Sequence, residues 1–315
     1  MATQCPDKVT LVIGGSRGIG RQVAIDFAKA GYAVVVSGRS ANDASTVAPF
    51  PPNPNSQQST ITTVTREIQE LGGIAAAIPV DTRDEKSVTK LIQDTVATFG
   101  RIDVLIYNSG AIWWSSVAGT PYKRYKLLQA VNADGLYASI QASLPVFEKQ
   151  GSKGRIIVVS PPIYSRFFRG KTAYSMAKVS MSVLVKGLAM DWEREGKKDM
   201  AITSIWPASS IDSAATTNFK ETNPDGARQL RKPTIYSDAM LAIVRAPAEK
   251  VNGLLTLDED FLREFEGVTD FSKYALVPGS TPPRTMPLEF PNLRVKEHDD
   301  EGNRIDSNLI RRSKL

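Results

Sequence analysis

The chain of 315 residues is long enough to bury a large core, and its 42% hydrophobic and 23% charged residues are typical of a folded globular protein. No apolar run is long enough to cross a bilayer, so we expect no membrane span. The net charge of +6 comes from scattered Lys and Arg residues that do not alternate with aromatic residues, which argues against nucleic-acid binding.

Cysteine and histidine are almost absent from the sequence. Cys5 is the only cysteine, so no internal disulfide or cysteine zinc cluster can form, and we expect no metal site. The only histidine, His298, lies in an acidic stretch, which argues against a Ser-His-Asp hydrolase. Asp7 and Lys8 directly precede the first short apolar run, which is the wrong order for a secretory signal.

Short apolar runs alternate with segments of helical period along most of the chain. Runs that are apolar on both faces and separated by helices are typical of a parallel sheet covered on both sides. The runs occupy residues 9–13, 33–37, 74–78, 102–107, 155–160, 201–206 and 254–257. The expected helices occupy the stretch that ends before Gly31 and residues near 57–71, 84–98, 121–148, 171–195 and 234–246. We predict an α/β, Rossmann-type doubly wound parallel sheet of about seven strands.

A glycine-rich loop, GGSRGIG, directly follows the first predicted strand and precedes a predicted helix. Without side chains the backbone can approach a pyrophosphate, and the helix N-terminus attracts its negative charge. The sequence therefore predicts a dinucleotide site. Its loop residues are Gly14, Gly15, Ser16, Arg17, Gly18, Ile19 and Gly20.

The end of the second strand indicates which dinucleotide binds. Ser37 and Gly38 stand where an acidic residue would hold an unmodified ribose 2′-hydroxyl. Arg39 follows, and Arg17 lies in the glycine loop, so two guanidinium groups would favour a 2′-phosphate through charge-assisted hydrogen bonds. We predict NADP rather than NAD. If Arg17 is only a solvated loop residue, Arg39 still favours NADP.

Two segments interrupt the regular alternation of strands and helices. Residues 40–58 are polar and rich in proline, and form either a surface insertion or a flap beside the adenosine end of the cofactor. We expect one domain over residues 1–258, followed by a C-terminal extension over 259–315. Within the extension, residues 277–304 read as extended and partly disordered.

Four motifs in one order carry a family resemblance. They are the glycine loop, the NSG of residues 108–110, Asn132 in VNADG, and Tyr174 with Lys178 in YSMAK. From about Val9 to Leu257 the chain resembles a short-chain dehydrogenase/reductase. The resemblance implies that Asp81 contacts the adenine and that Asn108 lines the cofactor cleft.

A narrower resemblance concerns the second half of the chain. SPP at 160–162, WPAS at 206–209 and residues 258–279 resemble the hydroxysteroid dehydrogenase-like protein 2 group. Ala208 stands where the wider family has a glycine after Pro207. That difference bears on the geometry of the loop on the nicotinamide side.

Hydride transfer between a nicotinamide and a carbonyl needs a proton at the developing alkoxide. Tyr174 is the candidate general acid or base, and the charge of Lys178, one helical turn on, would lower its pKa. The resemblance implies that Lys178 also holds the nicotinamide ribose. Asn132 would hold a water that links the lysine to solvent, or it is simply a residue that bonds within its helix.

The serine expected in this family is missing. Thirteen positions before Tyr174, where relatives have a serine that donates to the substrate oxygen, this chain has Pro161. Ser160 is the nearest hydroxyl and our candidate donor, although a shift of one residue in a strand turns a side chain to the opposite face. Alternatively Tyr164 or Ser165 replaces the serine, or no donor exists, which would cost roughly 10²–10³ in rate.

Aromatic residues follow several strands at the edge where the active site should lie. We expect a pocket for a bulky lipophilic carbonyl or alcohol, with residues 209–232 as a mobile lid. Trp206 is equally well explained as core. The candidate rings are Trp113, Trp114, Phe167, Phe168 and Trp206.

The chain ends in Ser313, Lys314 and Leu315, the tripeptide read by the peroxisomal import receptor, so we expect a peroxisomal protein. The resemblance further implies a homodimer or homotetramer formed through helices 121–148 and 171–195. The sequence thus predicts an NADP(H)-dependent oxidoreductase that interconverts a carbonyl and a hydroxyl. The alternative, suggested by Pro161, is a catalytically weak NADP-binding sensor or scaffold.

Overall fold

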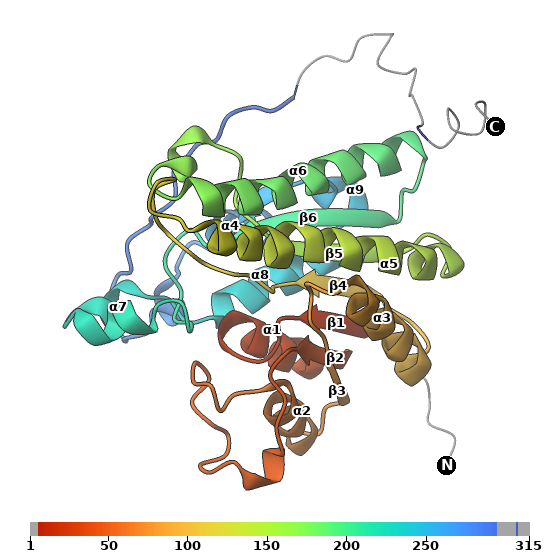
Figure 1. Ribbon diagram of the computed structural model, residues 1–315, viewed down its shortest axis with the longest axis horizontal. Helices are drawn as coiled ribbons and strands as arrows, with labels where there is room; N and C mark the ends of the chain where they lie inside the picture. The colour runs from red at the N-terminus through yellow and green to blue at the C-terminus, as the bar shows by residue number, and fades with distance from the viewer. Residues whose placement is uncertain (1–5, 295–306, 308–315) are drawn as a thin grey trace.

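A parallel sheet of seven strands forms the centre of the protein in the computed structural model, which describes residues 6–294 and 307 (Figure 1). The strand order is β3-β2-β1-β4-β5-β6-β7, and every pair is parallel. The predicted doubly wound fold is confirmed. The strands are β1 (Val9–Ile13), β2 (Ala33–Gly38), β3 (Ala75–Pro79), β4 (Val104–Tyr107), β5 (Gly154–Val159), β6 (Met200–Trp206) and β7 (Leu255–Leu257).

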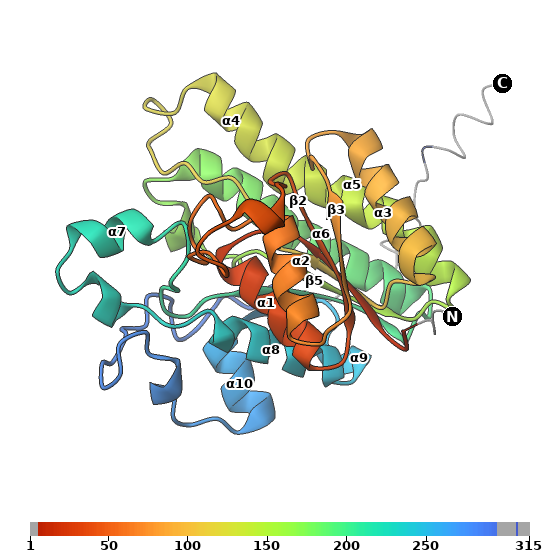
Figure 2. The same ribbon diagram turned by 90° about the horizontal axis from the view of Figure 1, so that it is seen from below.

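Helices cover both faces of the sheet (Figure 2). The helices are α1 (Gly18–Lys29), α2 (Ile61–Glu70), α3 (Glu85–Phe99), α4 (Tyr122–Leu128), α5 (Gly135–Lys149), α6 (Thr172–Arg194), α7 (Thr217–Thr222), α8 (Thr234–Arg245), α9 (Ala248–Val251) and α10 (Asp258–Glu266). Helices α1, α2, α8 and α10 share one hydrophobic cluster with Val12 of β1, whereas α3, α5 and α6 share another with Leu11 and Ile13. Successive strand residues enter opposite cores, which explains why these runs are apolar throughout.

The order in which strands are added to the sheet reverses between β1 and β4, although all strands stay parallel. The chain runs outward from β1 to β2 and β3 and then returns to place β4 on the other side of β1. Ligands bind beyond the carboxyl ends of the strands at such a switch point. The loop after β2 and helix α7 lie at this edge, on the left of Figure 1.

The helix expected over residues 121–148 is present as a continuous helical stretch, but its middle departs from α-helical geometry. Between α4 and α5 the chain forms a π-helical turn over Gln129–Asp134. Asn132 Nδ2 donates to the Leu128 carbonyl at 2.9 Å, and Tyr107 Oη donates to the Val131 carbonyl at 2.5 Å. These side chains satisfy two carbonyl groups in and beside the widened turn, and such turns are frequent at functional sites.

The C-terminal extension packs against the rest of the domain up to the last continuously described residue. Helix α10 buries Phe261 and Leu262 in the core that it shares with α8. Residues 277–294 form no helix or strand, as expected, but Thr285 and Met286 return to the carboxyl edge of the sheet. His298 and the tripeptide Ser313, Lys314 and Leu315 lie outside the described residues.

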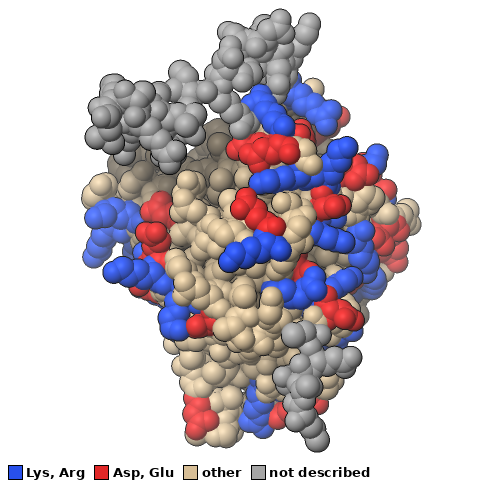
Figure 3. All heavy atoms as spheres, turned by 90° about the vertical axis from the view of Figure 1, so that its right-hand side faces the viewer, with Lys and Arg blue, Asp and Glu red and all other residues tan. Residues whose placement is uncertain are grey.

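Charges of both signs are mixed over the face seen in Figure 3, where Lys and Arg lie among Asp and Glu and form no continuous basic patch. Among residues 6–294, no helix combines the length and apolar character that a membrane span requires.

Candidate active site

The tightest packing at the carboxyl edge joins the glycine loop to the end of β4. Gly14 has a φ of +92°, and a Cβ added there would lie 2.6 Å from the Ser109 nitrogen. A Cβ at Gly20 would lie 2.1 Å from the Gly14 carbonyl oxygen, which accepts a hydrogen bond from Asn108 Nδ2 at 2.9 Å. Only glycine fits these two positions.

A cleft of about 480 Å³ opens above this contact. Its walls come from the glycine loop, the end of β2, the loop after β4 and the start of the expected lid. Gly15 and Gly20 lie beneath it, and the Gly15 amide donates to the Ser37 carbonyl at 2.9 Å. The predicted cofactor residues that line the cleft are Gly14, Ser16, Arg17, Gly18, Ile19, Arg39 and Asn108.

The N-terminus of α1 points into this cleft without a side-chain cap. In contrast, Thr60 and Asp84 cap α2 and α3. The first amides of a helix lack partners within it, so those at the start of α1 can meet negatively charged ligand oxygens. The glycines leave room for a pyrophosphate at this place, and the residues present fit a dinucleotide.

Residues 40–58 contact the glycine loop. The Pro54 carbonyl accepts a hydrogen bond from the Gly18 amide at 2.8 Å, and Ser59 Oγ donates to the Ser16 carbonyl at 2.8 Å. The carboxamide oxygen of Asn55 lies 3.5 Å from the position of a Cβ at Gly18. The segment is therefore a largely exposed surface segment that contacts the start of α1.

The two arginines expected at the ribose lie at the same cleft. Arg17 donates from Nη2 to Ser40 Oγ at 3.3 Å, and the exposed Arg39 side chain acts electrostatically on Asp81. Asp81 accepts from Arg83 Nε at 2.8 Å, and this guanidinium lowers the pKa of Asp81 to about 2. Asp81 itself does not line the cleft, although Val80 and Thr82 on either side do.

A second compartment of about 320 Å³ adjoins the first, and Ile19, Asn108 and Gly110 line both. Its lining is mainly apolar, and among the expected rings Trp114, Phe167 and Trp206 contribute to it. Trp113 and Phe168 do not, so the structure brings only three of the five rings together here.

Asn132 lies next to Lys178 but is buried and lines neither compartment. Tyr174 and Lys178 line the second compartment from one face of α6. A Cβ built on Gly110 would lie 3.2 Å from Asn132 Oδ1 and 3.4 Å from Lys178 Nζ, so the two side chains meet on either side of this glycine. Lys178 Nζ donates to the Val159 carbonyl at 2.8 Å.

Asn132 is fully committed to backbone partners. Besides its bond to Leu128, Nδ2 donates to the Ala111 carbonyl at 3.1 Å, and Oδ1 accepts from the Ala111 amide at 3.3 Å. Asn132 thus bonds within its helix, and it also fixes the loop after β4 beside Lys178. The π-helical turn is what points it inward.

Ser160 does not reach the cleft, and this corrects the expectation that it faces the nicotinamide. Its Oγ is fully buried between Ser182 Oγ at 2.9 Å and Ser204 Oγ at 3.1 Å. Val159, one residue earlier, lines the second compartment instead, because successive strand residues face opposite sides. Neither Tyr164 nor Ser165 lines it, and Tyr164 Oη lies 3.2 Å from the thioether of Met286.

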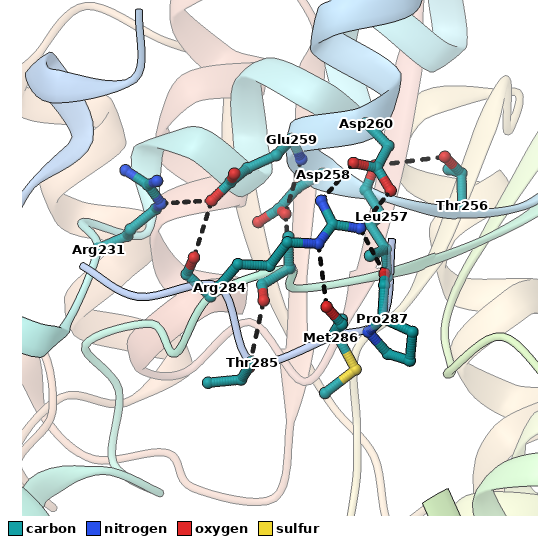
Figure 4. A network of polar contacts seen from close by, with 12 residues as sticks. Arg231, Thr256, Leu257, Asp258, Glu259, Asp260, Arg284, Thr285, Met286 and Pro287 are labelled. Carbon is teal, nitrogen blue, oxygen red and sulfur yellow. Dashed lines mark hydrogen bonds and ion pairs between the residues drawn. The ribbon is translucent and has the colours of Figure 1, made fainter. Parts of the chain in front are cut away.

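The loop after β6 is held from two sides by residues of the C-terminal extension (Figure 4). Asp258 Oδ1 accepts from the Ala208 amide at 2.8 Å, and the Ala208 carbonyl accepts from the amides of Thr285 and Met286 at 2.8 and 3.1 Å. Arg284 forms a two-pronged ion pair with Asp260 at 2.5 and 2.8 Å. Ala208 is accommodated in this loop, which is hydrogen-bonded on both sides.

The extension thereby forms part of the wall of the second compartment. Thr285 and Met286 line it, and no local sequence signal marked them because they lie far along the chain from the catalytic motif. Arg231, at the end of the expected lid, pairs with Glu259 at 2.6 Å in a buried contact. Its amide also donates to the Ser210 carbonyl at 2.9 Å, so both ends of the lid are fixed while α7 projects outward (Figure 1).

Comparison with known proteins agrees with this geometry. A family model described as enoyl-(acyl carrier protein) reductase matches residues 13–230. The chain belongs to the short-chain dehydrogenase/reductase family.

Individual relatives of this short-chain dehydrogenase/reductase extend the match. Human hydroxysteroid dehydrogenase-like protein 2 is 33% identical over 92% of this chain, which spans 66% of that protein's length. A putative dehydrogenase from Xanthomonas campestris is 31% identical, with a TM-score of 0.76 over 93% of this chain and 100% of its own. A 7α-hydroxysteroid dehydrogenase solved with NADH and 7-oxo glycochenodeoxycholic acid is 25% identical, with a TM-score of 0.64 over 81% of this chain and 94% of its own.

Burial controls the ionisation of the two central side chains of this dehydrogenase/reductase. It raises the pKa of Tyr174, so the phenol is protonated at neutral pH. It lowers the pKa of Lys178 to about 7, because the amine is removed from water and has no carboxylate partner among the described residues. The site thus presents a proton donor beside an amine that is partly neutral at neutral pH.

We predict that Lys178→Met changes how stability depends on pH. Between the folded pKa of about 7 and the ordinary lysine pKa of 10.5, the unfolded chain holds a proton that the folded protein lacks, so this lysine makes stability rise with pH. The melting temperature of Lys178→Met relative to the parent should therefore be higher at pH 6 than at pH 9. The exposed Lys123→Met serves as control. An equal difference at both pH values would contradict the burial argument.

Proposed function

We propose that the protein is an NADP(H)-dependent oxidoreductase that interconverts a carbonyl and a hydroxyl on a bulky lipophilic substrate. The observation that carries this proposal is the convergence of Tyr174 and Lys178 on an apolar compartment that adjoins the dinucleotide-shaped cleft. The related dehydrogenase solved with NADH and a 7-oxo compound supports reduction of an oxo group.

In this proposal the glycine loop, Arg17 and Arg39 would hold NADPH, which would supply a hydride to the carbonyl carbon. Tyr174, protonated because burial raises its pKa, donates its proton to the oxygen as negative charge develops there. Lys178 then stabilises the phenolate, and Asn132 keeps the loop at Gly110 and Ala111 in place beside the amine. Trp114, whose ring meets that of Tyr174 edge-on at 6.3 Å, limits access of water.

The alternative of a sensor or scaffold rests on Pro161, and the position of Ser160 adds to it. Loss of one hydrogen-bond donor at the substrate oxygen typically costs roughly 10²–10³ in rate, which slows turnover without abolishing it. Retention of the other three groups at a formed compartment therefore favours an enzyme over a scaffold.

Replacing Tyr174 separates the two functions. Tyr174→Phe removes the proton donor and should lower kcat with a ketone by about 10²–10⁴ while leaving cofactor affinity within a few-fold of the parent. NADPH oxidation with a panel of ketones measures the first quantity and fluorescence titration the second. Tight NADPH binding by the parent without turnover of any ketone, enone or acyl thioester would favour the scaffold.

For the cofactor, we propose NADP because Arg17 and Arg39 both line the cleft and no carboxylate follows β2. Arg39→Ser should weaken NADPH binding about tenfold or more, since hydrogen bonds to charged groups contribute roughly 1.5–3 kcal/mol, and should change NADH binding little. The exposed Lys153, at the opposite edge of the sheet before β5, gives the control Lys153→Ser. Equal affinities of the parent for NADPH and NADH would refute the assignment.

We also propose a homodimer or homotetramer formed through α5 and α6. Met176, Val183 and Met190 recur every seven residues along α6 with 51%, 57% and 44% of their surface exposed, and Tyr137 of α5 is 58% exposed. Such a stripe on a soluble helix marks a contact surface. Val183→Asp should reduce the mass measured by light scattering and leave the circular dichroism spectrum unchanged. A monomeric parent would exclude the assembly.

A further inference from the structure

A lysine that the reaction above does not use lies in the wall of the substrate compartment. Lys171 directly precedes α6, three residues before Tyr174, and lines the same compartment as Tyr174, Trp114 and Phe167. Its side chain is only partly exposed. The aliphatic stem and the ammonium group therefore belong to the surface that a substrate meets.

Two aromatic rings fix the position of the ammonium group. Lys171 Nζ lies 4.0 Å from the centroid of the Phe167 ring and 5.9 Å from that of Trp114. The same rings contact Tyr174, with centroid separations of 6.2 and 6.3 Å. The ammonium and the proposed proton donor thus share one aromatic wall, which places the cation beside the reacting centre and not in contact with it.

Within the described part of the chain, no carboxylate forms an ion pair with Lys171. Its ammonium group contacts the rings of Phe167 and Trp114. Partial burial lowers its pKa, as expected for an ammonium that has lost water without gaining a counter-ion. Tyr174 and the buried Lys178 are the other titratable groups that line the compartment among the described residues, and neither supplies a negative charge.

We propose that Lys171 binds a carboxylate carried by the substrate, so that the substrate is an apolar oxo acid or the corresponding hydroxy acid. The apolar body would lie against Trp114, Phe167, Trp206 and Met286, with the reacting carbon at Tyr174 and the carboxylate at Lys171. An anion held in this partly water-excluded place gains a charge-assisted hydrogen bond. The inference rests on the proposed function, because it names the substrate class of the same site.

The first test compares methyl ketones that differ in one charge. The probes are 4-oxopentanoate, 7-oxooctanoate and 10-oxoundecanoate, each with its methyl ester, and NADPH oxidation gives kcat/KM. At the optimal chain length the acid should exceed its ester by about ten- to a hundredfold, which is the range for a hydrogen bond to a charged group. Lys171→Gln should remove this difference, and Lys171→Arg should keep most of it.

The control is Arg169→Gln, which removes a basic charge from an exposed side chain on the same loop outside the compartment. It should preserve the preference for the acid. Equal kcat/KM for acid and ester in the parent would overturn the proposal. So would an equal fall in kcat for acid and ester in Lys171→Gln, because that would place the lysine at the reacting oxygen.

The second test does not depend on turnover. Calorimetry measures binding of octanoate, which carries no oxo group, to the protein saturated with NADP. Octanoate should bind the parent and Arg169→Gln alike and bind Lys171→Gln about tenfold or more weakly. Absence of this difference overturns the proposal even if ketones are reduced, whereas its presence supports the carboxylate site even if no ketone in the panel reacts.

Discussion

The contact between Gly14, Gly20 and Asn108 is the constraint on which the rest of the site depends. A Cβ at Gly20 would overlap the Gly14 carbonyl, and the Asn108 side chain bonds to that same carbonyl. The start of α1 is therefore held directly over the ends of β1 and β4, where the order of strands reverses. That placement gives the cleft its floor and brings the start of α1, which no side chain caps, to the cleft.

The positions of Asn132 and Lys178 depend on a second close contact, at Gly110. Because this residue has no side chain, Asn132 and Lys178 approach the loop after β4 from opposite sides. A π-helical turn holds Asn132, and the α-helical hydrogen-bond pattern is interrupted there. Tyr107 and Asn132 donate to carbonyl groups in and beside this turn. A local departure from α-helical geometry thus positions a group that a regular helix of the same sequence would turn elsewhere.

The second compartment depends on the C-terminal extension. Ala208, at the end of β6, is bonded through its amide to Asp258 and through its carbonyl to Thr285 and Met286, so the extension fixes the loop nearest the reacting centre. Pro161, beyond the end of β5, has no hydroxyl, and the Ser160 hydroxyl is hydrogen-bonded to those of Ser182 and Ser204. The compartment instead presents Lys171, a cation that forms no ion pair within the described part of the chain.

Interactions between near neighbours in the chain were determined by the sequence alone. The apolar runs predicted each of the seven strands within about two residues, because a strand buried on both faces must be apolar throughout. The glycine loop and the spacing of Tyr174 and Lys178 likewise depend on one turn and on one helical repeat. Only the tertiary structure decided the direction of Ser160, the π-helical turn at Asn132 and the contribution of Thr285 and Met286. Each of these depends on partners distant in sequence, whose hydrogen bonds and packing exist only once the sheet, the helices and the extension have come together.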